Sequence, residues 1–137
     1  MKERRLLVID DEPDICESIR RIAESQDFEV VTTLKAAAFD SAYDRFQPDV
    51  IMIDIVMPEV DGVELLKWLA ERRCTARIVM MTGYSRSYLS KAIDLGHGLG
   101  LPSVSGMQKP LSMEDLRSAL ALPAAAPQPM AASGGAS

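Results

Sequence analysis

Short apolar runs alternate along the chain with longer segments in which apolar residues recur every three or four positions. The short runs predict β-strands, and the longer periodic segments predict amphipathic helices. Because the two kinds of segment alternate, we expect parallel βαβ units with right-handed crossovers in a doubly wound α/β sheet. Strands are expected at residues 6–9, 28–32, 50–53, 77–81 and 103–107, and helices at residues 12–25, 35–46, 61–72, 86–96 and 112–120.

The third apolar run, residues 50–53, is apolar at every position and ends at Asp54. Such a strand is typical of a parallel sheet, in which both faces are buried. A carboxylate at its end is poorly placed for packing, but open α/β sheets bind their ligands at the carboxyl ends of the strands. Asp54 is therefore the first candidate for chemistry.

Residues at the helix starts support the helix assignments. Pro13 falls in the first turn of the first helix, where its missing N–H costs nothing. Asp61 and Glu64 have the spacing of a capping box, and Ser112 is expected to cap the last helix. We interpret Asp61 as a capping residue rather than as a reactive carboxylate.

The composition changes at residue 123, after which Ala, Pro, Gly, Ser and Gln dominate. A segment of this composition has too few large apolar side chains to bury a core. We therefore predict a folded domain at residues 1–122 and a disordered tail or linker at residues 123–137.

The overall composition narrows the possible functions. The net charge of −5 disfavours direct binding to nucleic acid or to an anionic membrane. No apolar run is long enough to span a membrane, and the N-terminus lacks a signal-peptide core, so we expect a cytoplasmic protein. Cys16 and Cys74 lack metal-ligand spacing and are interpreted as small apolar residues in a reducing compartment.

Polar residues follow four of the expected strands. Asp10 and Asp11 follow the first strand, Asp54 the third, Thr82 the fourth and Lys109 the fifth. In a parallel sheet these ends share one edge, and the strand order 2-1-3-4-5 would place the three carboxylates together. Carboxylates so close need a cation to remain ionised, and oxygen ligands suit Mg²⁺. With a lysine and a hydroxyl nearby, the site fits phosphoryl transfer to an Asp nucleophile.

Four segments together resemble the receiver (CheY-like) domain of two-component response regulators. They are LVIDDEP at residues 7–13, DIVMPEVDG at residues 54–62, TGY at residues 82–84 and Lys109–Pro110. Each alone is a weak signal, whereas all four in this order at strand ends are specific. The resemblance covers residues 4–121 and implies a flavodoxin-like fold with five parallel strands in the order 2-1-3-4-5.

The resemblance implies that Asp54 accepts a phosphoryl group from a histidine kinase or a histidine phosphotransfer protein. Lys109 would pair with that group, the Thr82 hydroxyl would bond one of its oxygens, and the Lys109–Pro110 bond would be cis. The domain would not be a classical enzyme, since it would catalyse only its own phosphorylation and a slower hydrolysis.

The resemblance also implies a magnesium site. Asp11 and Asp54 would bind Mg²⁺ directly, together with the backbone carbonyl of Val56, and Asp10 would hold the ion through water. Val56 has no side-chain group that could position a water molecule, so we expect a long-lived phosphoryl state.

Two features depart from the family pattern. Gly106 stands three positions before Lys109, where the family usually carries an aromatic residue. Residues 95–102 also form a longer stretch than usual between the fourth helix and the fifth strand. Both lie at the usual output surface, so we expect an atypical switch and unusual output and dimerisation, with intact phosphoryl chemistry. Whether the chain forms a homodimer stays open.

Three other functions are compatible with parts of this pattern. A pseudo-receiver would bind partners without phosphorylation; the intact acidic residues argue against it, and Gly106 argues for it. A small phosphatase of related chemistry would need a second Asp two residues after the nucleophile, where Val56 stands. A flavin-binding protein would need a phosphate-binding loop after the first strand, where Asp10 and Asp11 would repel phosphate.

The output also stays open, as either an unknown partner protein or an effector domain after residue 122.

Overall fold

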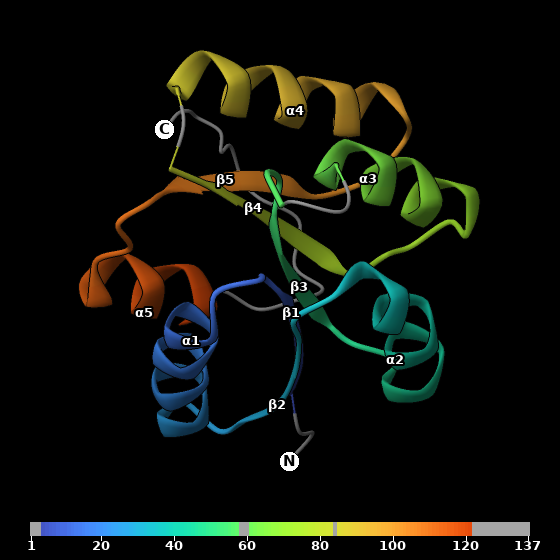
Figure 1. The fold of residues 1–137 in the computed structure, drawn as a ribbon. Helices are drawn as coiled ribbons and strands as arrows, with labels where there is room; N and C mark the ends of the chain where they lie inside the picture. Colours follow the sequence, from blue (N-terminus) through green and yellow to red (C-terminus); the bar gives the residue numbers. More distant parts are fainter. Residues whose placement is uncertain (1–3, 58–60, 84, 122–137) are drawn as a thin grey trace.

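Five parallel strands form one sheet in the order β2-β1-β3-β4-β5 (Figure 1). The predicted class of fold and strand order are thus confirmed. The structure, a computed structural model, describes residues 4–57, 61–83 and 85–121. The strands are β1 Arg4–Ile9, β2 Phe28–Thr33, β3 Val50–Asp54, β4 Arg77–Thr82 and β5 Val104–Gln108.

Helices cover both faces of this sheet (Figure 1). Helices α1 and α5 pack on one face, and α2, α3 and α4 pack on the other. The helices are α1 Pro13–Ser25, α2 Phe39–Phe46, α3 Gly62–Glu71, α4 Arg86–Gly98 and α5 Met113–Ala121, and a short 3-10 helix, η1 Ala36–Ala38, precedes α2.

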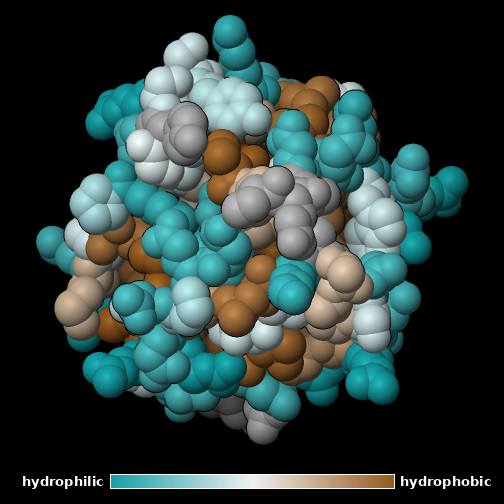
Figure 2. Space-filling view, viewed as in Figure 1, coloured by the Kyte–Doolittle hydropathy of each residue, from teal (hydrophilic) through white to brown (hydrophobic). Residues whose placement is uncertain are grey.

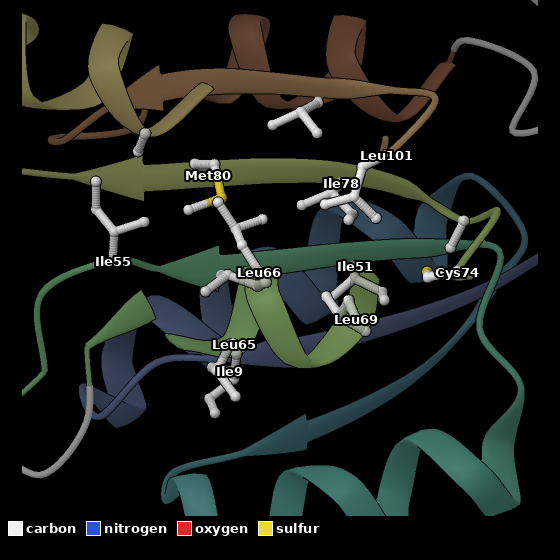
Figure 3. Packing of buried hydrophobic residues seen from close by; sticks show 14 of the residues in the cluster. Ile9, Ile51, Ile55, Leu65, Leu66, Leu69, Cys74, Ile78, Met80 and Leu101 are labelled. Atoms are coloured by element: carbon white, nitrogen blue, oxygen red, sulfur yellow. The ribbon is translucent and has the colours of Figure 1, made fainter. Parts of the chain in front are cut away.

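Strand β3 shows how the apolar pattern builds the core, because all of its residues are buried. Side chains alternate between the two faces of a strand. Ile51 and Ile53 therefore join the cluster under α2, α3 and α4, which Figure 3 draws, while Val50 and Met52 join the cluster under α1 and α5. Burying an aliphatic side chain of this size contributes about 1.5–3 kcal/mol.

The outer surface carries few large apolar side chains. On the face shown in Figure 2, hydrophilic residues cover most of the rim, and hydrophobic residues form small separate areas between them. Leu34 and Met113 are the large hydrophobic residues that stand exposed in the described part of the chain. No helix within residues 4–57, 61–83 or 85–121 is long and apolar enough to cross a membrane.

The expectation of one continuous helix at residues 35–46 is wrong in its first part. The chain first forms η1, and the α-helix begins at Phe39. The residue before it, Ala38, makes no side-chain cap hydrogen bond. Alanine has no acceptor for the free N–H groups of a first turn, so this start lacks the usual cap.

The fourth helix ends later than the expected residue 96, so the connection to the fifth strand is shorter than expected. Helix α4 continues to Gly98, and Leu101 is buried in the core. Gly96 does not make a turn: it brings the helix close to β5, since a Cβ there would lie 2.9 Å from Val104 Cγ2. The end of the helix therefore packs on the edge strand β5.

Both predicted helix caps are present. Asp61 Oδ1 accepts from the N–H of Val63 at 2.9 Å, and Ser112 Oγ accepts from the N–H of Asp115 at 3.0 Å. Cys16 and Cys74 are buried and free, as expected of packing residues. Burial raises the pKa of the Cys16 thiol to about 11.

Several predictions fall outside the described residues. They concern Tyr84, residues 58–60 of the loop after Asp54, and the tail at residues 123–137. The domain boundary at residue 122 and the cytoplasmic location stay predictions.

Candidate functional site

Four carboxylates meet at the carboxyl ends of β1 and β3. The two strands pair in parallel with Ile9 opposite Ile53, so the residues that follow them come together. One oxygen from each of Asp10, Asp11, Glu12 and Asp54 lies within 4.8 Å of the others. The predicted grouping of Asp10, Asp11 and Asp54 is confirmed, and Glu12 joins it. The signal for Glu12 was its place in the acidic run directly after the first strand.

The two carboxylates nearest the core are almost fully shielded from water. Asp10 has 0% of its surface exposed and Asp54 has 3%, whereas Glu12 is exposed. A buried carboxylate is unfavourable unless charges and hydrogen bonds compensate for its lost hydration. The surroundings of these two side chains therefore have to supply positive charge and donors.

Lys109 supplies the positive charge. Its Nζ lies 2.8 Å from Asp10 Oδ2, 3.2 Å from Asp54 Oδ2 and 3.7 Å from Glu12 Oε2. The N–H of Lys109 donates to the carbonyl of Thr82 at 2.7 Å, which joins the ends of β5 and β4. The peptide bond between Lys109 and Pro110 is cis, as expected. The lysine thus reaches the acidic cluster from the far side of β4.

Backbone N–H groups hold the other oxygen of each buried carboxylate. Asp54 Oδ1 accepts from the N–H of Val56 at 3.0 Å, and Asp10 Oδ1 accepts from the N–H of Glu12 at 2.9 Å. Each carboxylate therefore has one oxygen fixed by the backbone and one oxygen directed at Lys109. A ligand that binds at the Oδ2 atoms would therefore share them with Lys109, whereas the side chain of Asp11 forms no ion pair with the lysine within the described residues.

The balance of charge and burial shifts two pKa values. Burial raises the pKa of Asp54, while the Val56 N–H and the Lys109 ammonium act in the opposite direction. Burial alone would lower the pKa of Lys109, but Asp10 and Asp54 outweigh it, so its pKa is raised. Lys109 therefore remains a cation at neutral pH.

The residues at this edge fit a magnesium ion. Carboxylate oxygens are the hard donors that Mg²⁺ prefers, and the ion uses few of them because it keeps several waters. Asp10 Oδ2 is buried and makes no aligned hydrogen bond within the described residues, although Lys109 balances its charge. Acidic side chains grouped in this way at a strand edge would accept a divalent cation.

Thr82 on β4 and Gly106 on β5 lie on the side of this cluster from which Lys109 approaches. Thr82 is fully buried at the end of β4, one residue beyond the pairing of Asp54 with Met81. Gly106 on β5 pairs with Met80 on β4. A Cβ on Gly106 would lie 2.8 Å from Leu89 Cδ1 and 2.9 Å from Ile93 Cδ1. Side chains of α4 therefore fill the space that an aromatic side chain would need.

Comparison with known proteins agrees with this geometry. The family described as response regulator receiver domain matches residues 6–121. The chemotaxis protein CheY of Listeria monocytogenes is 34% identical over 77 residues, which are 56% of this chain and 65% of that protein. The regulatory protein PhoP of Bacillus subtilis, named for alkaline phosphatase synthesis, is 26% identical over 113 residues, which are 82% of this chain and 45% of that protein. The chain thus spans less than two thirds of the length of these relatives.

Solved structures share the fold. A response regulator from Colwellia psychrerythraea is 27% identical with a TM-score of 0.75, and the match covers 87% of this chain and 94% of that one. A CheY-like receiver domain protein from Methanospirillum hungatei also has a TM-score of 0.75 at 24% identity, over 87% of this chain and 91% of that one. Since the family match spans nearly all of the described residues and the acidic cluster lies where its motifs predict, the chain belongs to the response regulator receiver domain family and not to a family of classical enzymes.

Proposed function

We propose that this receiver domain takes part in phosphorelay signalling by accepting a phosphoryl group on Asp54. The donor is a histidine kinase or a histidine phosphotransfer protein, and Mg²⁺ is required. The observation that carries the proposal is the setting of Asp54. Its carboxylate is 3% exposed at the end of β3, belongs to a cluster of four acidic side chains, and lies 3.2 Å from Lys109 Nζ.

Asp54 is the nucleophile in this proposal. A carboxylate oxygen attacks the phosphorus of the phosphohistidine, the P–N bond breaks, and the imidazole leaves with the electron pair and takes up a proton. An aspartyl phosphate is formed. Lys109 then pairs with a phosphoryl oxygen, which is consistent with an Nζ that already lies near Asp54 Oδ2. The Thr82 hydroxyl bonds another oxygen after a small movement of the buried end of β4.

Asp11, Asp54 and the backbone carbonyl of Val56 would hold Mg²⁺, with Asp10 acting through water. The ion, when bound, supplies positive charge to the phosphoryl oxygens. The chain's own contribution is to keep the carboxylates ionised and close together, which Lys109 and the backbone donors support. Glu12 is the exposed member of the cluster and is not assigned as a ligand.

Phosphate incorporation tests the proposal directly. The protein is incubated with acetyl phosphate, with and without Mg²⁺, and weighed intact by mass spectrometry. We expect a gain of one phosphoryl group that needs the metal and is absent in Asp54→Asn. Asp44→Asn, which removes an exposed carboxylate on α2, is the matched control and should be labelled like the wild type. No gain in the wild type would support the pseudo-receiver alternative.

A further inference from the structure

Asp10 has none of its surface exposed, and contacts reach it from several parts of the fold. Its Oδ1 accepts from the N–H of Glu12, and Lys109 Nζ lies 2.8 Å from its Oδ2. Its own N–H donates to the carbonyl of Thr33, the last residue of β2, at 3.1 Å. Its backbone carbonyl accepts from the thiol of Cys16, with 3.4 Å between Sγ and O. The Cys16 thiol is therefore a side-chain contact that ties the backbone of Asp10 to helix α1.

Helix α1 begins without the usual side-chain cap. Glu12 stands at the cap position, but it makes no side-chain cap hydrogen bond, and its Oε2 instead lies 3.7 Å from Lys109 Nζ. Pro13, the first residue of the helix, has no N–H to donate. The N–H of Cys16 donates to the carbonyl of Glu12 at 3.2 Å, and its thiol reaches further back, to the carbonyl of Asp10. Cys16 thus joins the start of the helix to the acidic run.

The contact lies inside the core. Cys16 is 4% exposed and belongs to the cluster of buried residues under α1 and α5. A thiol is a weak donor, but a buried carbonyl that loses its donor pays the cost of its lost hydration. The backbone of Asp10 would turn to regain a partner, and its carboxylate would move with it. A change at Cys16 would in this way reach the oxygen that Lys109 contacts.

We propose that Cys16 is a positioning residue for the phosphorylation site: its thiol fixes the backbone carbonyl of Asp10 and so keeps the Asp10 carboxylate aligned with Lys109 and with the proposed magnesium site. The inference rests on the proposed phosphorylation of Asp54. The thiol takes no part in the chemistry and forms no bond to the metal or to the phosphoryl group. Without it, Asp10 is less well placed, so more Mg²⁺ is needed for the same rate of phosphorylation.

Two variants of Cys16 test this role, because Cys16→Ala removes the donor and Cys16→Ser keeps one. The rate of phosphoryl incorporation from acetyl phosphate is followed by intact mass over a series of Mg²⁺ concentrations, well below the midpoint of thermal unfolding. Cys16→Ala should need about two- to ten-fold more Mg²⁺ than the wild type for its half-maximal rate, the effect of losing one hydrogen bond. Cys16→Ser should restore most of the wild-type value, since a hydroxyl also donates to a carbonyl.

Cys74 provides the matched control, since it is the other buried free cysteine. It belongs to the cluster on the opposite face of the sheet, under α2, α3 and α4 (Figure 3). Cys74→Ala and Cys74→Ser make the same changes of volume and polarity away from Asp10. Both should therefore show the wild-type dependence on Mg²⁺.

Urea unfolding of the four variants without Mg²⁺ separates positioning from stability. A merely structural role of Cys16 would make the Mg²⁺ dependence follow the free energy of unfolding, whichever cysteine is changed, and that result would overturn the proposal. A wild-type Mg²⁺ dependence in Cys16→Ala, or a Cys16→Ser that behaves like Cys16→Ala, would also overturn it. These outcomes require a labelled wild type and leave the proposed function in place, whereas an unlabelled wild type overturns the proposed function and this inference with it.

Discussion

Burial disfavours the ionised form of Asp54, so the free energy of unfolding should depend on its protonation. Its pKa is raised chiefly by burial. A carboxyl with a higher pKa in the folded chain stabilises folding most when protonated, and this contribution is lost as the pH rises through the folded pKa. Ionising this side chain therefore costs stability in the folded chain.

Asp54→Asn never ionises, so it should be more stable than the wild type at neutral pH, by on the order of 1 kcal/mol. The gain should shrink as the pH falls through the raised pKa of the wild-type carboxyl, and it should vanish below the ordinary carboxyl range. Urea unfolding across this pH range measures the difference, with Asp44→Asn as the exposed control. A variant that is less stable than the wild type at neutral pH would contradict the assigned direction of the pKa shift.

Val56 is expected to set the lifetime of the proposed aspartyl phosphate. It follows Asp54 by two positions and presents an apolar side chain, so nothing at this position orients a water molecule for attack. Val56→Asn adds an amide that can orient a water molecule, so the aspartyl phosphate of this variant should hydrolyse several-fold faster than that of the wild type. The upper limit is the effect of a well-placed group in proton transfer, about 10²–10⁴-fold. Loss of label after removal of the donor gives both rates. Equal or longer lifetimes in the variant would refute this role.

Helix α4 and strand β5 pack closely at two glycines, one on each element. Gly96 on the helix lies against Val104, and Gly106 on the strand lies against Leu89 and Ile93. Because nothing but hydrogen stands at these positions, the helix can approach the strand more closely than ordinary side chains allow. Side chains of α4 therefore occupy the space beside Gly106 on β5.

Gly106→Ala should therefore be destabilising even though alanine suits a strand better than glycine. The new methyl group would lie 2.8–2.9 Å from Leu89 and Ile93, and overpacking of this kind typically costs about 1–3 kcal/mol. Chemical denaturation measures the loss. Ser105→Ala, at an exposed neighbour on the same strand, is the control and should be near neutral.

Leu89→Ala distinguishes overpacking from other causes. If the clash with Leu89 is the reason, the loss from Gly106→Ala should be smaller in a Leu89→Ala background, since contacting sites are not additive. Equal losses in both backgrounds would show that Leu89 does not fill the space over Gly106.

At the scale of the whole molecule, the acidic edge should link metal binding to folding. The cluster exists only when β1 and β3 are paired, so the unfolded chain has no comparable site. A ligand that binds the folded chain alone stabilises it, by about 2.7 kcal/mol at a concentration 100 times its Kd. Mg²⁺ should therefore raise the midpoint of thermal unfolding in a concentration-dependent way.

Asp11→Asn should largely remove this stabilisation, because it takes away a proposed direct ligand and little else from the core. Asp14→Asn, at an exposed position in the first turn of α1, is the matched control and should respond to Mg²⁺ like the wild type. An unfolding midpoint that is insensitive to Mg²⁺ in the wild type would argue against a magnesium site.

The order and type of most elements could be predicted from the apolar runs and the helical periodicity, because burial acts on each segment separately. The sequence also indicated the shared edge for Asp10, Asp11 and Asp54, because the carboxyl ends of parallel strands must meet. The four motifs placed the chain in its family, and Lys109 followed from its position after the fifth strand.

The tertiary structure decided what depends on contacts between distant segments. It brought Glu12 within reach of Lys109. It also made Gly96, expected in a long connection, and Gly106 sites of close packing between α4 and β5. A sequence pattern shows which residues are small, polar or charged, but not which surface each one meets. That depends on how closely α4 approaches β5 and α3, which no single segment specifies.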